Sequence, residues 1–155
     1  MDVRRLGPED WELFRDVRLL ALADSPGAFG SSLERERAYT EQHWRDWMAP
    51  DRGLKAVVDG TAGVVGVWRP EDREAELYSM WVDPASRGRG VADALLHEAL
   101  RWAREQELGS VDLWVVGDNE RARRLYERHG FRRTGEEQPY PRDPSLVEYV
   151  MRRTL

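Results

Sequence analysis

The chain has 155 residues, of which 41% are hydrophobic and 34% charged, so it is long enough to fold as one domain (1–155) around a sizeable core. Its net charge of −5 argues against nonspecific binding to nucleic acid and fits a cationic partner better. Because the chain has no cysteine and its three histidines are widely separated, thiolate chemistry, disulfides and a recognisable metal site are excluded.

Missing motifs exclude further classes of protein. No apolar run approaches the roughly 18 residues that a membrane span needs, and MDVRRLGPED lacks the apolar core of a signal peptide, so we expect a cytoplasmic protein without a membrane partner. The only lysine, Lys55, lies in RGLKAVV, which is not a P-loop. The nucleophile motif G-x-S-x-G is also absent.

The N-terminal third predicts one strand and two helices. The strand covers Val3–Leu6, and the first helix follows Pro8, with an apolar face formed by Trp11, Leu13, Phe14, Val17, Arg18, Leu20 and Leu22. The sequence DSPGAFG ends this helix, and Ser31 with Glu34 fits a capping box. Thr40 is expected to begin a second short helix through Trp44 and Trp47.

From Leu54 onwards the pattern changes to that of strands. Three strands are predicted over residues 54–59, 62–69 and 75–82, followed by a helix over 91–107 that Gly109 stops. A strand over 111–116, a helix over 119–130 ended by Gly130, and two strands, one beginning at Phe131 and one over 146–152, complete the chain. The expected order is β-α-α-β-β-β-α-β-α-β-β.

Two glycines interrupt the polar stretch VDPASRGRGVA just before the helix that begins near Val91. At a helix N-terminus, Gly88 and Gly90 would let the backbone turn tightly and present successive N–H groups to a diphosphate. Arg87 and Arg89 would add guanidinium donors for phosphate oxygens. On the glycines alone, a tight strand-to-helix turn without any ligand is the favoured explanation.

The residues around this turn resemble the GNAT superfamily of acyl-CoA-dependent N-acetyltransferases. Arg87-x-x-Gly90-x-Ala92 fits its R/Q-x-x-G-x-G/A signature, with Ala92 where many members carry glycine, and MWVDP precedes it. The stretch DNERARRLYERHGF is similar to a second signature of the family. The resemblance implies an α/β (α+β) GNAT fold: a mixed, mostly antiparallel sheet of about six to seven strands flanked by about four helices.

The resemblance also implies a site for acetyl-CoA. Its pyrophosphate would contact the backbone N–H groups of Gly88, Arg89, Gly90, Val91, Ala92 and Asp93. Its pantetheine arm would pair with Met80, Trp81 and Val82, a backbone N–H near Met80 would bind the thioester oxygen, and Asn119 would contact the cofactor near the pantetheine end. The run Arg121, Arg123 and Arg124 would reach the outer phosphates or form a solvated helix face.

Two residues are catalytic candidates by the same resemblance. Tyr126 takes the position of the phenol that protonates the departing thiolate, although a tyrosine on an amphipathic helix is ordinarily a core residue. Glu76 coincides with a strand carboxylate that some members use as the base, and a solvated strand residue is the alternative. A base on the following strand is excluded because Trp114 occupies that position, and Glu34 is a reserve candidate.

The acceptor amine is expected to contact Asp24–Met48, called here the acceptor-side segment. Its aromatic and acidic residues, with Phe29, Glu34 and Trp44 as candidates, would form an amine pocket, or the aromatics would belong to the core.

The resemblance thus predicts direct transfer of an acetyl group from acetyl-CoA to a primary amine, with neither metal nor nucleic acid, and a homodimer is compatible with it. A non-catalytic acyl-CoA sensor with the same fold is the alternative. A nucleotide binder unrelated to CoA is disfavoured because the chain lacks a P-loop.

Overall fold

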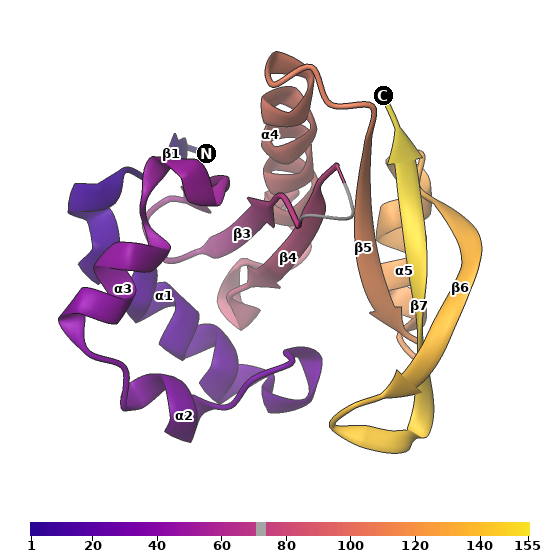
Figure 1. Ribbon diagram of the computed structural model, residues 1–155, viewed down its shortest axis with the longest axis horizontal. Helices are drawn as coiled ribbons and strands as arrows, with labels where there is room; N and C mark the ends of the chain where they lie inside the picture. The colour runs from indigo at the N-terminus through magenta and orange to yellow at the C-terminus, as the bar shows by residue number, and fades with distance from the viewer. Residues whose placement is uncertain (71–73) are drawn as a thin grey trace.

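The computed structural model describes residues 1–70 and 74–155, which build one seven-stranded sheet with helices on both faces (Figure 1). The strands are β1 (Val3–Arg5), β2 (Leu54–Val58), β3 (Gly63–Trp68), β4 (Glu76–Val82), β5 (Ser110–Val116), β6 (Arg132–Tyr140) and β7 (Asp143–Thr154). The α-helices of this part of the chain are α1 (Trp11–Asp24), α2 (Leu33–Arg37), α3 (Glu41–Trp47), α4 (Val91–Glu105) and α5 (Glu120–Arg128).

The sheet is mixed and mostly antiparallel, as the resemblance to the GNAT superfamily implies. Its strands lie in the order β1-β2-β3-β4-β5-β7-β6, and only the β4–β5 pair is parallel among the described strands. The crossover between β4 and β5 is α4, which packs on β2, β3 and β4. A parallel neighbour requires such a crossover, so this connection places the ends of β4 and β5 at the same edge of the sheet.

Two apolar clusters hold helices to the two faces of the sheet. One cluster joins α4 and α5 to the sheet through residues such as Leu95, Ala99 and Phe131, all with 0% exposure. The other joins α1 and α3 to the opposite face through residues such as Phe14 and Trp44. In α4 the buried positions recur at helical spacing, which is why the predicted stripe from Val91 to Ala99 faces the core.

The predicted order of elements is confirmed with one addition, the five-residue helix α2. The predicted capping box of Ser31 and Glu34 is wrong, because Ser32 is the N-cap and its side chain accepts a hydrogen bond from the Arg35 N–H at 3.1 Å. Leu20 does not widen the apolar face of α1, since it is 48% exposed. The helix α4 ends before Gly109, and Glu107 takes the left-handed conformation with φ of 58°.

Candidate functional site

A cavity of about 640 Å³ opens where β4 and β5 separate. The two strands pair at Glu76 and Asp112, and beyond this point they diverge (Figure 1). The cavity is bounded by the C-terminal ends of both strands and by the N-terminal turns of α4 and α5. A crevice outside the carboxyl ends of parallel strands is a recurrent place for ligands in α/β sheets.

Most of the residues predicted from the sequence line this cavity. They are Phe29, Met80, Trp81, Val82, Arg87, Gly88, Gly90, Val91, Ala92, Asp93, Asn119, Arg121 and Tyr126. Six predicted residues do not belong to the lining among the described residues, namely Glu34, Trp44, Glu76, Arg89, Arg123 and Arg124. Ser25, Ala28 and Trp114 also line the cavity, although the sequence did not identify them as site residues.

The glycine turn has the backbone geometry of an anion site. Gly88 and Gly90 have φ of 78° and 82°, and Gly90 is the N-cap of α4. A Cβ atom at either position would meet no heavy atom within 4 Å, so these glycines are required by backbone conformation and not by packing. The first N–H groups of α4 lack partners within the helix, and they lie at the positive end of its dipole.

Arg87 is held in place at the rim of the cavity. Its Nη2 lies 2.7 Å from Oδ2 of Asp24, and its Nε donates to the carbonyl of Val82 at 3.1 Å. The hydrogen bond from the Trp81 indole, followed by those from Ser25 and Arg87, holds the pKa of Asp24 below its ordinary value. The carboxylate therefore stays ionised and fixes both Arg87 and Trp81.

Tyr126 brings a buried phenol to the cavity. The residue is 7% exposed, and its ring packs edge-on against Phe131 with 5.8 Å between ring centroids. Burial raises the pKa of Tyr126 above its ordinary value, so the hydroxyl is protonated at neutral pH. Asn119 supports the same helix, because its side chain accepts a hydrogen bond from the Ala122 N–H at 3.1 Å.

Asp93, in the first turn of α4, is paired with the end of α5. Its Oδ1 lies 2.7 Å from Nε2 of His129 and 3.0 Å from Nη2 of Arg128. The hydrogen bond with His129, then that with Arg128, lowers the pKa of Asp93. The guanidinium of Arg128 offsets a negative charge that would otherwise repel an anion at this end of the cavity.

The candidate base lies away from the cavity. Glu76 is half-buried at the start of β4, opposite Trp68 and Asp112. It precedes Met80 by four residues, which is roughly 13 Å along an extended strand. The sequence could not show that Glu76 lies outside the cavity, because it does not show where β4 separates from β5.

The acceptor-side segment is divided between the core, the surface and the cavity. Trp44 is 1% exposed and stacks on Trp47, so it offers no surface to an acceptor, while Glu34 is exposed on α2. Phe29 lines the cavity. The hairpin of β6 and β7 reaches the segment near Phe29, where the Tyr140 hydroxyl donates to the carbonyl of Gly27 at 2.7 Å.

Comparison with known proteins agrees with this geometry. A model described as the acetyltransferase (GNAT) family matches residues 15–131. A mycothiol acetyltransferase of Beutenbergia cavernae is 36% identical over 72% of this chain and 37% of its own length. The N-alpha-acetyltransferase RimI of Mycobacterium tuberculosis is 40% identical over 61% of this chain and 58% of its own length. The chain thus spans only part of these relatives.

Solved structures show the same fold. The crystal structure of a GNAT-family acetyltransferase from Streptococcus pneumoniae superposes with a TM-score of 0.78 over 99% of this chain and 98% of that chain, at 22% identity. No helix in residues 1–70 and 74–155 is long and apolar enough to cross a membrane.

Proposed function

The chain belongs to the acetyltransferase (GNAT) family, and from this premise we propose that it transfers the acetyl group of acetyl-CoA directly to an amine. One observation carries the proposal. The glycine turn at the N-terminus of α4 and the buried phenol of Tyr126 face the same cavity of about 640 Å³. The turn supplies donors for phosphate, and the phenol supplies a proton beside the place where a thiolate would leave.

The residues of the cavity fit acetyl-CoA. The N–H groups at the start of α4 would accept the pyrophosphate, and the open space beside Gly88 and Gly90 would let the phosphates approach the backbone. Arg87, held by Asp24, would add a fixed guanidinium. The free backbone edge that β4 leaves where it separates from β5 would pair with the pantetheine arm.

The chemistry then needs a donor for the thioester oxygen, a proton for the sulfur and a base for the amine. Acetyl-CoA supplies the activated acetyl thioester. A backbone N–H near Met80 or Trp81 would stabilise the negative charge that develops on the thioester oxygen during attack. Tyr126 would donate its phenolic proton to the leaving sulfur, because burial keeps that proton in place at neutral pH.

Glu76 is the proposed base. Because it lies roughly 13 Å along β4 from Met80, it would act through ordered water and not by direct contact with the amine. Water could carry the proton without any residue moving. Direct transfer of the acetyl group fits a chain without cysteine, since no acyl-cysteine can form.

The names of the relatives suggest two candidate classes of acceptor for this chain. One relative is a mycothiol acetyltransferase, and another is an N-alpha-acetyltransferase. A small amine or the N-terminal amine of a polypeptide would each reach the cavity past Phe29 and the β6–β7 hairpin.

A thiol-release screen tests the proposal. The protein is incubated with acetyl-CoA and a panel of small amines, amino acids, peptides with free N-termini and lysine-containing peptides blocked at the N-terminus. Amine-dependent release of CoA is expected for one of these classes. Tight binding of acetyl-CoA without release for any class would favour the non-catalytic acyl-CoA sensor.

A further inference from the structure

A buried ion pair joins two helices of the N-terminal region. Arg18 of α1 is 6% exposed and Glu36 of α2 is 1% exposed. Two parallel hydrogen bonds of 2.9 Å connect them, one from Nε and one from Nη2 of Arg18. The guanidinium also lies over the rings of Phe29 and Trp47, at 5.0 and 5.3 Å from their centroids. Arg18 is thus enclosed by charge and by aromatic surface.

The remaining nitrogen of this guanidinium, Nη1, contacts β4. Nη1 of Arg18 donates to the hydroxyl of Ser79, which is 5% exposed. Ser79 has φ of 56°, a left-handed conformation that residues other than glycine rarely adopt. Such a conformation persists only where the surrounding structure holds it. In this protein the side chain that contacts the Ser79 hydroxyl is Arg18.

Ser79 belongs to a β-bulge that turns the remainder of β4. Gly66 pairs with Tyr78 and Val64 pairs with Trp81, so Val65 alone faces two residues of β4. The bulge reverses the alternation of side chains. Leu77 packs in the α4 cluster whereas Trp81 packs in the α1 cluster. In a regular strand these two side chains, four positions apart, would point to the same face of the sheet. Met80 and Trp81 therefore reach the cavity in an orientation that a regular strand would not give.

We propose that Arg18 and Glu36 are positioning residues, which hold the β4 bulge through Ser79 and thereby orient the backbone of Met80 and Trp81 toward the thioester. This inference rests on the proposed function. A buried ion pair is a poor source of stability, because desolvation offsets the attraction between the charges. Its geometric effect is larger, since misplacement of a reacting group by about 1 Å can cost roughly a hundredfold in rate.

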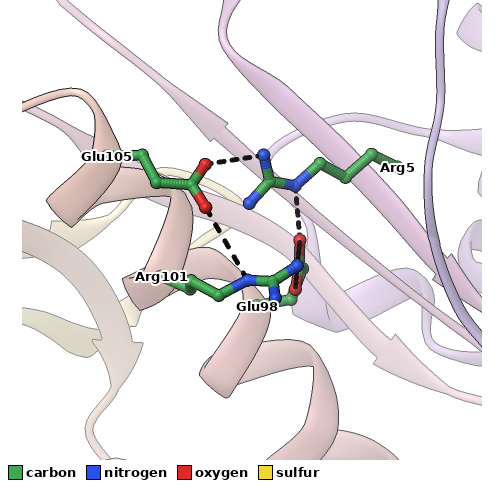
Figure 2. A network of polar contacts seen from close by, with 4 residues as sticks. All are labelled: Arg5, Glu98, Arg101 and Glu105. Atoms are coloured by element: carbon green, nitrogen blue, oxygen red, sulfur yellow. Dashed lines mark hydrogen bonds and ion pairs between the residues drawn. The ribbon is translucent and has the colours of Figure 1, made fainter.

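The test replaces both charges by apolar residues of similar volume in the double variant Arg18→Met/Glu36→Leu, which leaves no unpaired charge. The matched control is Arg5→Met/Glu98→Leu, which removes one cation and one anion from the four-residue network of ion pairs between β1 and α4 and leaves Arg101 paired with Glu105 (Figure 2). Neither Arg5 nor Glu98 lines the cavity. Each protein is measured for melting temperature, affinity for acetyl-CoA, kcat, and the NMR resonances of the Ser79, Met80 and Trp81 amides.

The proposal predicts that Arg18→Met/Glu36→Leu melts within about 5 °C of the wild type and loses tenfold to a hundredfold in kcat. Its affinity for acetyl-CoA falls by less than kcat does, because the phosphate contacts at the start of α4 do not involve the bulge. The three amide resonances shift or broaden in this variant and stay unchanged in the control. A folded double variant with wild-type kcat and unchanged amide resonances would overturn the proposal. If the double variant does not fold, Ser79→Ala removes the hydroxyl alone, and a wild-type kcat in Ser79→Ala would then overturn it.

The two hypotheses fail in different ways. If the wild-type protein acetylates no amine, the proposed function fails, and the amide resonances still report whether Arg18 and Glu36 hold the bulge. If the wild type is active and the variants match it in rate and spectrum, only the positioning role fails.

Discussion

Asp24, the last residue of α1, forms an ion pair with Arg87 in the turn before α4, with 2.7 Å between Oδ2 and Nη2. The same carboxylate accepts a hydrogen bond of 2.9 Å from the indole of Trp81. One side chain at the end of the first helix therefore fixes both the end of β4 and the glycine turn. Trp81 and Arg87 lie 57 and 63 residues away from Asp24 in the sequence, so no local pattern reveals these two contacts.

The Asp24 pair should make stability depend on pH. Because the hydrogen bonds from Trp81, Ser25 and Arg87 lower the pKa of Asp24, its contribution is fully present above the unfolded value near 3.8 and is lost as the pH falls through the lower folded value. Asp24→Asn should lower the free energy of unfolding by about 1 kcal/mol at pH 6 and by less at pH 3. Urea unfolding at both pH values measures this, and an equal loss at both would contradict it.

Gly90→Glu should abolish binding of acetyl-CoA without unfolding the protein. The new side chain would enter the cavity and its carboxylate would repel the diphosphate, so affinity should fall at least about 100-fold in calorimetry. Gly60→Glu is the matched control, because Gly60 has φ of 76°, has equally open space and lies outside the cavity lining. Both variants carry the same backbone strain, of about 1 kcal/mol, but only the change at Gly90 should affect affinity. Equal affinities in the two would refute the phosphate assignment.

Tyr126→Phe should keep the ring and its packing but remove the proton donor. We expect kcat to fall at least roughly tenfold with little change in the affinity for acetyl-CoA. Tyr149→Phe serves as the control, because Tyr149 is 4% exposed in the same apolar cluster and does not line the cavity. A wild-type kcat in Tyr126→Phe, with chemistry shown to limit turnover, would make Tyr126 a packing residue.

Lys55 should destabilise the fold near neutral pH. It is 3% exposed, its ammonium lies over the rings of Phe14 and Trp47, and none of the carboxylates that the structure describes is paired with it. Burial, together with the charge of Arg52, lowers its pKa from 10.5 to about 8. Between these values the unfolded chain binds more protons than the folded one, so stability rises with pH.

Lys55→Met should therefore raise the free energy of unfolding at pH 7. The gain has an upper bound of about 3 kcal/mol, less whatever the two ring contacts contribute. The advantage should shrink as the pH rises from about 8 toward 10, which denaturant unfolding at pH 7 and pH 10 would measure. An advantage that does not change with pH would show that the charge of Lys55 is not the cause.

Local patterns were sufficient for the parts of the fold that local chemistry determines. The change from helical to strand spacing at Leu54, the Thr40 cap of α3 and the glycine turn before α4 are each encoded within a few residues. The Thr40 side chain accepts from the His43 N–H at 3.1 Å, as a helix N-cap does.

Other features depend on contacts between distant residues. The bulge at Ser79 carries no glycine, so no residue of AELYSMWV marks its position in the sequence. Arg18 lies on the apolar face of α1 because Glu36 and Ser79 meet it there, and neither partner is visible from the helix alone. From the sequence alone, Trp44 could belong either to the wall of a pocket or to the core. The packing of α3 on α1 places it in the core. Eight of the nine residues of β6 are exposed, so this strand has no alternation of apolar and polar residues that would reveal its extent.

The most direct test of acetyl transfer to an amine is its stoichiometry, measured by mass spectrometry of the amine together with assay of free CoA in one reaction. Direct transfer predicts one acetylated amine for each CoA released, with no release when the amine is omitted. Release of CoA that does not depend on the amine, or that yields acetate in place of an acetylated amine, would contradict it.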